Sequence, residues 1–237
     1  MQRAKVDFNV LCAVNAVNSE HPLAVYRFFR DELEARYLQF IPIVERINDD
    51  GRMLLQQGNR VTDRSVKPER YGQFLIEVFD EWVRHDAGRV FMQTVDAVLD
   101  SWVYGLSSLC MFRPECGEGV ALEHNGDLYS CDHFVEPGHL LGNILETPLA
   151  ELVNSEQQRR FGQDKRATLP RYCREYRYLF ECHGECPKHR FLVAPDGEAG
   201  LNHLCAGLRA YFGHVDPYMR TMAGLLSQRR PARSSTA

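Results

Sequence analysis

The sequence lacks the features that would place the protein in a membrane, outside the cell or on a nucleic acid. It contains no run of about 18 apolar residues, so it predicts no transmembrane helix. Its N-terminus, MQRAKVDFNV, has no apolar segment of the kind that a signal peptide needs. Lysine and arginine are spread along a chain of formal net charge −4, which excludes a strongly basic nucleic-acid-binding surface. These absences favour a cytoplasmic protein that binds neither membranes nor nucleic acids.

The composition is otherwise that of an ordinary globular protein. The chain of 237 residues is 44% hydrophobic and 25% charged, enough to bury the core of one or two domains. One short basic run, Arg229, Arg230 and Arg233, lies in the polar tail SQRRPARSSTA. We predict that this tail is a frayed terminus.

Cysteine is nearly missing from the first hundred residues and is concentrated after them. Cys12 stands alone on a predicted apolar strand, where core packing is its expected role. The other seven of the eight cysteines are Cys110, Cys116, Cys131, Cys173, Cys182, Cys186 and Cys205. Because nothing in the sequence predicts export, we interpret these seven as metal ligands rather than as a disulfide framework.

Two kinds of metal site compete for these cysteines. Structural zinc typically uses paired C-x2-C units. Here the short spacings are x5, from Cys110 to Cys116, and x3, from Cys182 to Cys186, and a whole hairpin precedes Cys131. Thiolates drawn from separate segments suit an iron–sulfur cluster better than a single ion, so we favour clusters over zinc.

The first hundred residues predict three successive βα units. The expected strands span residues 6–14, 38–44 and 90–94, and the expected helices follow Pro22, Pro68 and Thr94, with a long loop over 47–66. Such a repeat is typical of a parallel sheet covered by helices. Three units are too few to close a barrel, so the first strand is expected to have an open edge.

The rest of the chain predicts less regular structure. A hairpin is expected over residues 120–129 with its turn at Asn125 and Gly126, and a helix from Pro148 to about Gln163. Residues 171–203 are rich in cysteine, glycine and histidine, and metal binding is expected to organise them. Two terminal helices, over 204–212 and 218–226, are expected on either side of Pro217.

The cysteine pattern resembles that of the SPASM domain, which holds auxiliary [4Fe-4S] clusters in radical S-adenosylmethionine (SAM) enzymes. The shared pattern is C-x9-G-x4-C, then C-x2-C-x5-C-x3-C, then a distant cysteine, with one departure at Tyr176. The chain is most similar to the anaerobic sulfatase-maturating enzymes, through CGEGVALEHNGDLYSCDHFV, LGNI, ECPKHRF, FNVLCAVN and QFIPIVER. This resemblance covers the chain up to about Phe212, and the cysteine spacing makes it specific.

The resemblance implies an α/β fold of two units and a tail. Residues 1–105 would form the C-terminal half of a parallel βα barrel, 106–212 a small cysteine-rich α+β SPASM domain, and 213–237 a helical tail with a disordered end. The family binds its SAM cluster through a C-x3-C-x2-C motif early in the barrel, and this sequence contains none. We therefore expect the chain to be the C-terminal part of a larger enzyme, inactive without an N-terminal half supplied in the same gene or in trans. We assign no SAM contact.

The resemblance also implies the ligands of two auxiliary clusters. Cluster I would be held by Cys110, Cys116, Cys131 and Cys186, and cluster II by Cys173, Cys182 and Cys205. Tyr176 stands where the family has the fourth ligand of cluster II. Three states are open for cluster II: a three-cysteine site with an open or phenolate-filled position, a labile cluster, or no cluster. Among six histidines near the cysteines, His183 is the best substitute ligand, although an ordinary loop role is expected for most of the six.

Asp132, directly after Cys131, is the catalytic base that the resemblance implies. In the family, a 5′-deoxyadenosyl radical removes a hydrogen from Cβ of a cysteine or serine in a sulfatase polypeptide. A base takes the thiol or hydroxyl proton, the remaining electron passes to an auxiliary cluster, and the product is Cα-formylglycine (3-oxoalanine). The residues alone fit a turn cap at Asp132 better, so the assignment depends on the resemblance.

The expected function is therefore anaerobic sulfatase maturation by a radical SAM oxidoreductase. The cofactors would be one or two auxiliary [4Fe-4S] clusters, with SAM and its own cluster in the N-terminal half. The expected partners are a sulfatase polypeptide and a reductant such as flavodoxin or ferredoxin. Three alternatives are another SPASM peptide-modifying enzyme, a non-enzymatic peptide-binding module stabilised by zinc or a single cluster, and a degenerate gene product that folds poorly.

Overall fold

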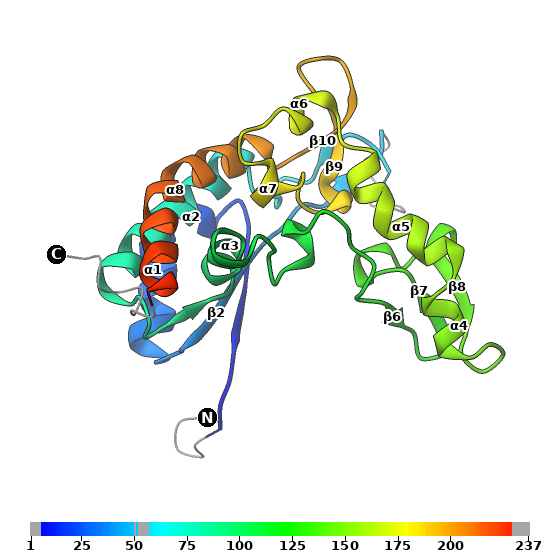
Figure 1. Cartoon of the computed structure of the whole chain (residues 1–237), viewed down its shortest axis with the longest axis horizontal. Helices are drawn as coiled ribbons and strands as arrows, with labels where there is room; N and C mark the ends of the chain where they lie inside the picture. The colour runs from blue at the N-terminus through cyan, green and yellow to red at the C-terminus, as the bar shows by residue number, and fades with distance from the viewer. Residues whose placement is uncertain (1–5, 50, 52–56, 229–237) are drawn as a thin grey trace.

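The computed structural model describes residues 6–49, 51 and 57–228. The chain forms two lobes joined through the cysteine-rich region (Figure 1). The larger lobe contains a parallel sheet with helices, and the smaller contains a short antiparallel sheet beside α4 and α5. The basic tail residues Arg229, Arg230 and Arg233 lie outside the described residues. Within the described residues, the search for a helix with the length and apolar character of a membrane span finds none.

The larger lobe has the predicted parallel sheet, in the order β1-β2-β5. Its strands are β1 (Val10–Val14), β2 (Tyr37–Pro42) and β5 (Phe91–Met92). All three are shorter than predicted. The third ends early because α3 starts at Gln93, where the Asp96 carboxylate accepts a hydrogen bond from the Met92 N–H at 2.9 Å. Within the described residues β1 pairs with β2 alone, which agrees with the predicted open edge.

Helices follow the strands in the predicted order. They are α1 (Pro22–Arg27), extended by a π-helical turn over Phe28–Glu32, then α2 (Pro68–His85) and α3 (Gln93–Tyr104). The predicted apolar face of α2 is buried throughout: Tyr71, Phe74, Leu75, Val78 and Trp82. The segment predicted as a long loop also contains a short antiparallel pair, β3 (Arg46–Ile47) with β4 (Arg60–Val61).

A single C-terminal helix, α8 (Cys205–Ser227), packs on α2 and α3. The prediction of two helices separated by Pro217 is therefore wrong, and the predicted boundary at residue 212 falls inside this helix. Pro217 removes one backbone donor, but the apolar face continues past it: Leu208, Tyr211, Phe212, Val215, Met219 and Met222 are all buried. Asp216, just before the proline, accepts hydrogen bonds from Arg220 and Trp102. Continuous packing thus outweighs the local break.

Helices α2 and α8 cross at a pair of glycines. A Cβ atom added at Gly207 would overlap the carbonyl oxygen of Pro68, and one added at Gly72 would overlap the backbone of Gly207. Both obstacles are backbone atoms, so no side-chain rotation relieves them. The close approach of the two helices therefore requires glycine at both positions.

Gly207→Ala is expected to destabilise the fold by about 3 kcal/mol, because the new methyl group forces α8 away from α2. Denaturant unfolding monitored by circular dichroism measures this. Gly213→Ala is the matched control, since Gly213 lies on the same helix and a Cβ there meets nothing within 4 Å. The control should gain about 0.5–1 kcal/mol. Equal unfolding midpoints for the two variants would contradict this account of the crossing.

The smaller lobe is built on the predicted hairpin. Its sheet has the antiparallel order β6-β7-β8, with β6 (Ala121–Leu122), β7 (Asp127–Tyr129) and β8 (Leu140–Asn143). Gly126 has φ +92°, as the predicted turn requires, whereas Asn125 does not adopt a positive φ. The predicted single helix is instead two, α4 (Leu149–Val153) and α5 (Glu156–Ala167). The break occurs because the Ser155 hydroxyl accepts the Gln158 N–H and caps a new helix.

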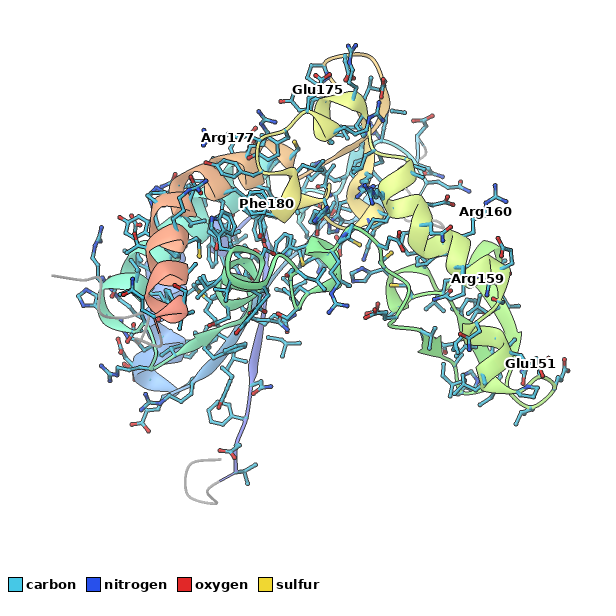
Figure 2. All side chains as sticks on the ribbon, viewed as in Figure 1. Glu151, Arg159, Arg160, Glu175, Arg177 and Phe180 are labelled. Atoms are coloured by element: carbon cyan, nitrogen blue, oxygen red, sulfur yellow. The ribbon has the colours of Figure 1, made fainter. Side chains whose placement is uncertain are left out.

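The cysteine-rich segment contains short elements that connect the two lobes. They are α6 (Arg171–Arg174), α7 (Leu179–Cys182), and the antiparallel strands β9 (Arg190–Val193) and β10 (Ala199–Asn202). In Figure 2, Phe180 of α7 lies over α3, and its ring is 4.8 Å from that of Trp102. This segment therefore packs against the larger lobe as well as carrying three of the cysteines, Cys173, Cys182 and Cys186.

Candidate metal centre

The four thiols predicted for cluster I meet from three separate segments. Burial raises the pKa of Cys116 and that of Cys131, the latter to about 12, and the neighbouring Cys110 raises both further. Burial likewise raises the pKa of Cys186, and Cys131 adds to that rise. Such influence weakens with distance, so Cys116 and Cys131 each lie near Cys110, and Cys186 lies near Cys131. We refer to Cys110, Cys116, Cys131 and Cys186 as site I.

The remaining predicted ligands form a second group. Burial raises the pKa of Cys182 to about 12 and that of Cys205 to about 11, and Cys173 raises both. Burial also raises the pKa of Tyr176, with Cys182 and Cys205 contributing. We refer to Cys173, Tyr176, Cys182 and Cys205 as site II. The site II residues line one cavity, and the two ligand sets, with what each binds, remain predictions.

The spacing of the thiols bears on which metal they suit. Tetrahedral zinc with Zn–S bonds of about 2.3 Å would hold its thiolates within about 4 Å of one another. Within the described residues, the one group of three ligating side chains with all its ligand atoms inside 4.8 Å is Cys131, Asp132 and His133. No three thiols of site I therefore lie as close together as a bound zinc ion would hold them.

A buried lysine holds the backbone that carries the first cysteine. Lys165 is 1% exposed, and its Nζ donates to the carbonyl oxygens of Cys110, Met111 and Arg113 at 2.6, 2.9 and 2.5 Å. Burial lowers the pKa of Lys165 to about 8, and the nearby Arg190 lowers it further. Lys165 therefore fixes the position of Cys110 relative to α5.

Our sequence analysis did not identify Lys165, although the pattern of α5 contains a signal. Gln158, Gly162 and Lys165 are spaced as one helical face, and all three are buried. Arg159 and Arg160 lie on the outer side of the same helix (Figure 2). Lys165 shares its helical face with Gln158 and Gly162 and not with the exposed arginines. This spacing indicates that the lysine side chain faces the interior.

A left-handed turn connects the two sites. His183, Gly184 and Glu185 have φ values of +41°, +72° and +54°, between Cys182 of site II and Cys186 of site I. Non-glycine residues rarely adopt this conformation unless their surroundings hold it. The half-buried Arg190 does so by donating to the carbonyl oxygens of all three residues, at 2.6, 2.9 and 3.2 Å in chain order. Because of this turn, Cys182 belongs to site II and Cys186 to site I, although only three residues separate them.

Asp132 and His133 lie beside the thiols of site I. The Asp132 carboxylate is exposed and accepts a hydrogen bond from Cys131 Sγ at 3.2 Å. His133 Nδ1 lies 3.3 Å from Cys186 Sγ. His133 thus reaches a sulfur atom of site I, a contact that was not predicted, while His183 as the substitute fourth ligand of cluster II stays a prediction. The spacing gave no signal for His133, since its partner is 53 residues away.

Comparison with known proteins gives consistent matches. The family model for the SPASM iron–sulfur cluster-binding domain matches residues 110–176. A serine-type anaerobic sulfatase-maturating enzyme of Bacteroides thetaiotaomicron is 46% identical over 98% of this chain and 58% of its own length. A cysteine-type enzyme of Clostridium perfringens is 26% identical over 94% of this chain and 58% of its own length.

A solved structure gives the same match at the level of the fold. Native anSMEcpe with bound AdoMet and Cp18Cys peptide superposes with a TM-score of 0.81 at 26% identity, over 95% of this chain and 60% of that one. The chain therefore spans little more than half the length of the relatives that it matches.

Proposed function

Since this chain belongs by sequence and fold to the anaerobic sulfatase-maturating enzymes, of which it covers little more than half the length, we propose that it is the cluster-binding part of such an enzyme. The activity would be oxidation of a serine or cysteine in a sulfatase polypeptide to Cα-formylglycine, in the cytoplasm. The observation that carries this proposal is that Cys131 and Cys186, 55 residues apart in the sequence, both lie beside His133, with the exposed Asp132 carboxylate next to them. A [4Fe-4S] cluster held by site I would supply the electron acceptor.

Asp132 is the residue of this chain that we propose as the base. Its carboxylate is exposed, so a substrate hydroxyl or thiol can reach it, and its place directly after Cys131 in the chain keeps it next to site I. Proton transfer to a positioned carboxylate and electron transfer to an adjacent acceptor would then take place at one location.

Serine is the residue that we propose as the first target. The serine-type relative of Bacteroides thetaiotaomicron is 46% identical to this chain, and the cysteine-type relative of Clostridium perfringens is 26% identical. The difference in identity supports the serine-type assignment.

The parallel sheet supports the proposal that residues 1–105 are half of a barrel. One face of the sheet packs on helices through Val14, Leu38 and Phe40, which are buried. The opposite face leaves apolar side chains exposed, with Leu11 at 62% and Phe91 at 44%. We propose that a further polypeptide of this family, encoded upstream or separately, covers this face and brings the SAM site. A reductant such as flavodoxin or ferredoxin would serve the assembled enzyme.

The test is reconstitution of the activity. The chain is combined under anaerobic conditions with the remaining part of the Bacteroides serine-type relative, either fused or as a separate polypeptide, together with SAM, dithionite and a sulfatase-derived peptide. Mass spectrometry should show the loss of two hydrogen atoms from the target serine. The intact relative is the positive control. An unmodified peptide in a mixture whose positive control works, from a fused protein that holds iron and sulfide, would overturn the proposal.

A further inference from the structure

The residues of site II surround a narrow cavity with a volume of about 20 Å³. Its lining consists of the three thiols with Tyr172, Tyr176, Leu179, Gly184, Asn202, Leu208 and Arg209. About 10–15 Å³ is needed to admit one water molecule, so this space holds about one. A [4Fe-4S] cluster contains eight heavy atoms, so it needs more space than site II offers while the Tyr176 ring lies there.

The ring of Tyr176 is fixed in place by helix α8. The Arg209 guanidinium lies over the Tyr176 ring, 4.1 Å from its centroid, and also faces the Tyr172 ring at 4.9 Å. The Tyr176 hydroxyl donates to the Arg209 carbonyl oxygen at 3.4 Å, and the Tyr178 ring meets Tyr176 edge-on at 5.6 Å. The contacts with Arg209 and Tyr178 and the hydrogen bond at the hydroxyl hold the ring among the thiols that line this cavity.

Arg209 cannot easily withdraw, because its helix is held on the opposite side. Helix α8 crosses α2 at Gly72 and Gly207, two residues before Arg209, where the backbones are in close contact. Leu208, beside Arg209, is 1% exposed and belongs to the core of the larger lobe. A shift of α8 that opened site II would therefore also separate the α2–α8 crossing.

We infer that Tyr176 and Arg209 together replace the second auxiliary cluster, so that this chain holds a cluster at site I alone. The inference rests on the proposed function for the nature of the cluster at site I. The replacement of cysteine by Tyr176 does more than remove one ligand. Three thiolates are sufficient to hold some clusters, but no set of ligands can hold a cluster in a cavity that a side chain fills. Cys173, Cys182 and Cys205 would remain as thiols around the aromatic ring.

Iron and acid-labile sulfide per chain test this inference after anaerobic purification and reconstitution. The unchanged chain should bind about four of each, and Tyr176→Cys should bind about eight of each, since the smaller side chain opens the cavity and completes the ligand set. Tyr176→Phe should remain at about four, because the ring rather than the phenolic oxygen fills the site. A Tyr176→Cys chain that remains at four would overturn the assignment of Tyr176 as the residue that closes site II.

A second pair of variants tests the inference in the unchanged background, whether or not Tyr176→Cys folds. Cys205→Ser should keep the full iron content, whereas Cys186→Ser, the matched change in site I, should lose most of it. Loss of half of the iron in Cys205→Ser, or about eight iron atoms in the unchanged chain, would overturn the inference while leaving the proposed function intact. A chain that takes up zinc and no sulfide would instead refute the proposed function.

Discussion

Replacement of Cys131 by serine is expected to remove nearly all iron and sulfide from the chain and to abolish maturation activity in the assembled enzyme. Cys131 interacts electrostatically with Cys110 and also with Cys186, so it is the thiol that links the separate segments of site I. A serine hydroxyl is a far weaker ligand for iron than a thiolate. Chemical analysis of iron and sulfide, with the visible absorbance of the cluster, measures the loss.

The control for Cys131→Ser is Cys12→Ala. Cys12 lies on β1 in the core of the larger lobe, and its pKa is raised by burial alone, without influence from another cysteine. Its replacement should leave the iron content unchanged. If the Cys131→Ser variant retains its full iron content, Cys131 is not a cluster ligand. The assignment of site I as a four-cysteine cluster site would then be wrong.

Asp132→Asn is expected to reduce maturation activity by about 10²–10⁴-fold, the usual effect of a positioned base. Asparagine has nearly the shape of aspartate but does not accept the substrate proton, so iron and sulfide should remain at the level of the unchanged chain. Peptide conversion measured by mass spectrometry, alongside iron analysis of the same preparation, separates these two quantities. The Asp132→Glu variant should recover part of the activity.

Asp63→Asn makes the same chemical change at an exposed position outside site I and should leave both quantities unchanged. If Asp132→Asn loses iron in proportion to activity, then the carboxylate supports the ligand Cys131 and does not act as a base. If activity is retained at full iron content, another group takes the proton.

The parallel sheet and the hairpin could be predicted because local patterns determine them. Apolar runs mark β1 and β2, Pro68 starts a helix with a regular apolar face, and Gly126 supplies the positive φ of the hairpin turn. The continuous helix α8 could not be predicted in this way. Pro217 is a local signal for a break, and only the packing of α8 against α2, more than a hundred residues earlier, overrides it.

The assignment of cysteines to two sites could not be derived from spacing. Cys182 and Cys186 are separated by three residues, and proximity in sequence would place them in one site. The left-handed turn at residues 183–185 divides them, and two of its three residues are not glycine. Lys165 holds the backbone of Cys110 from 55 residues away, and Arg190 donates to the carbonyl oxygen of Lys165 from 25 residues away. The resemblance to a family supplied what the spacing could not.

The position of α8 has a consequence for synthesis on the ribosome. The core of the larger lobe is formed by residues near the start of the chain together with Leu208, Tyr211, Phe212 and Val215 near its end. Domains usually fold as the chain emerges, N-terminal part first. Here the sheet and α2 would emerge early yet keep an uncovered apolar surface until the last helix is made. The nascent chain would therefore depend on chaperones until α8 is made.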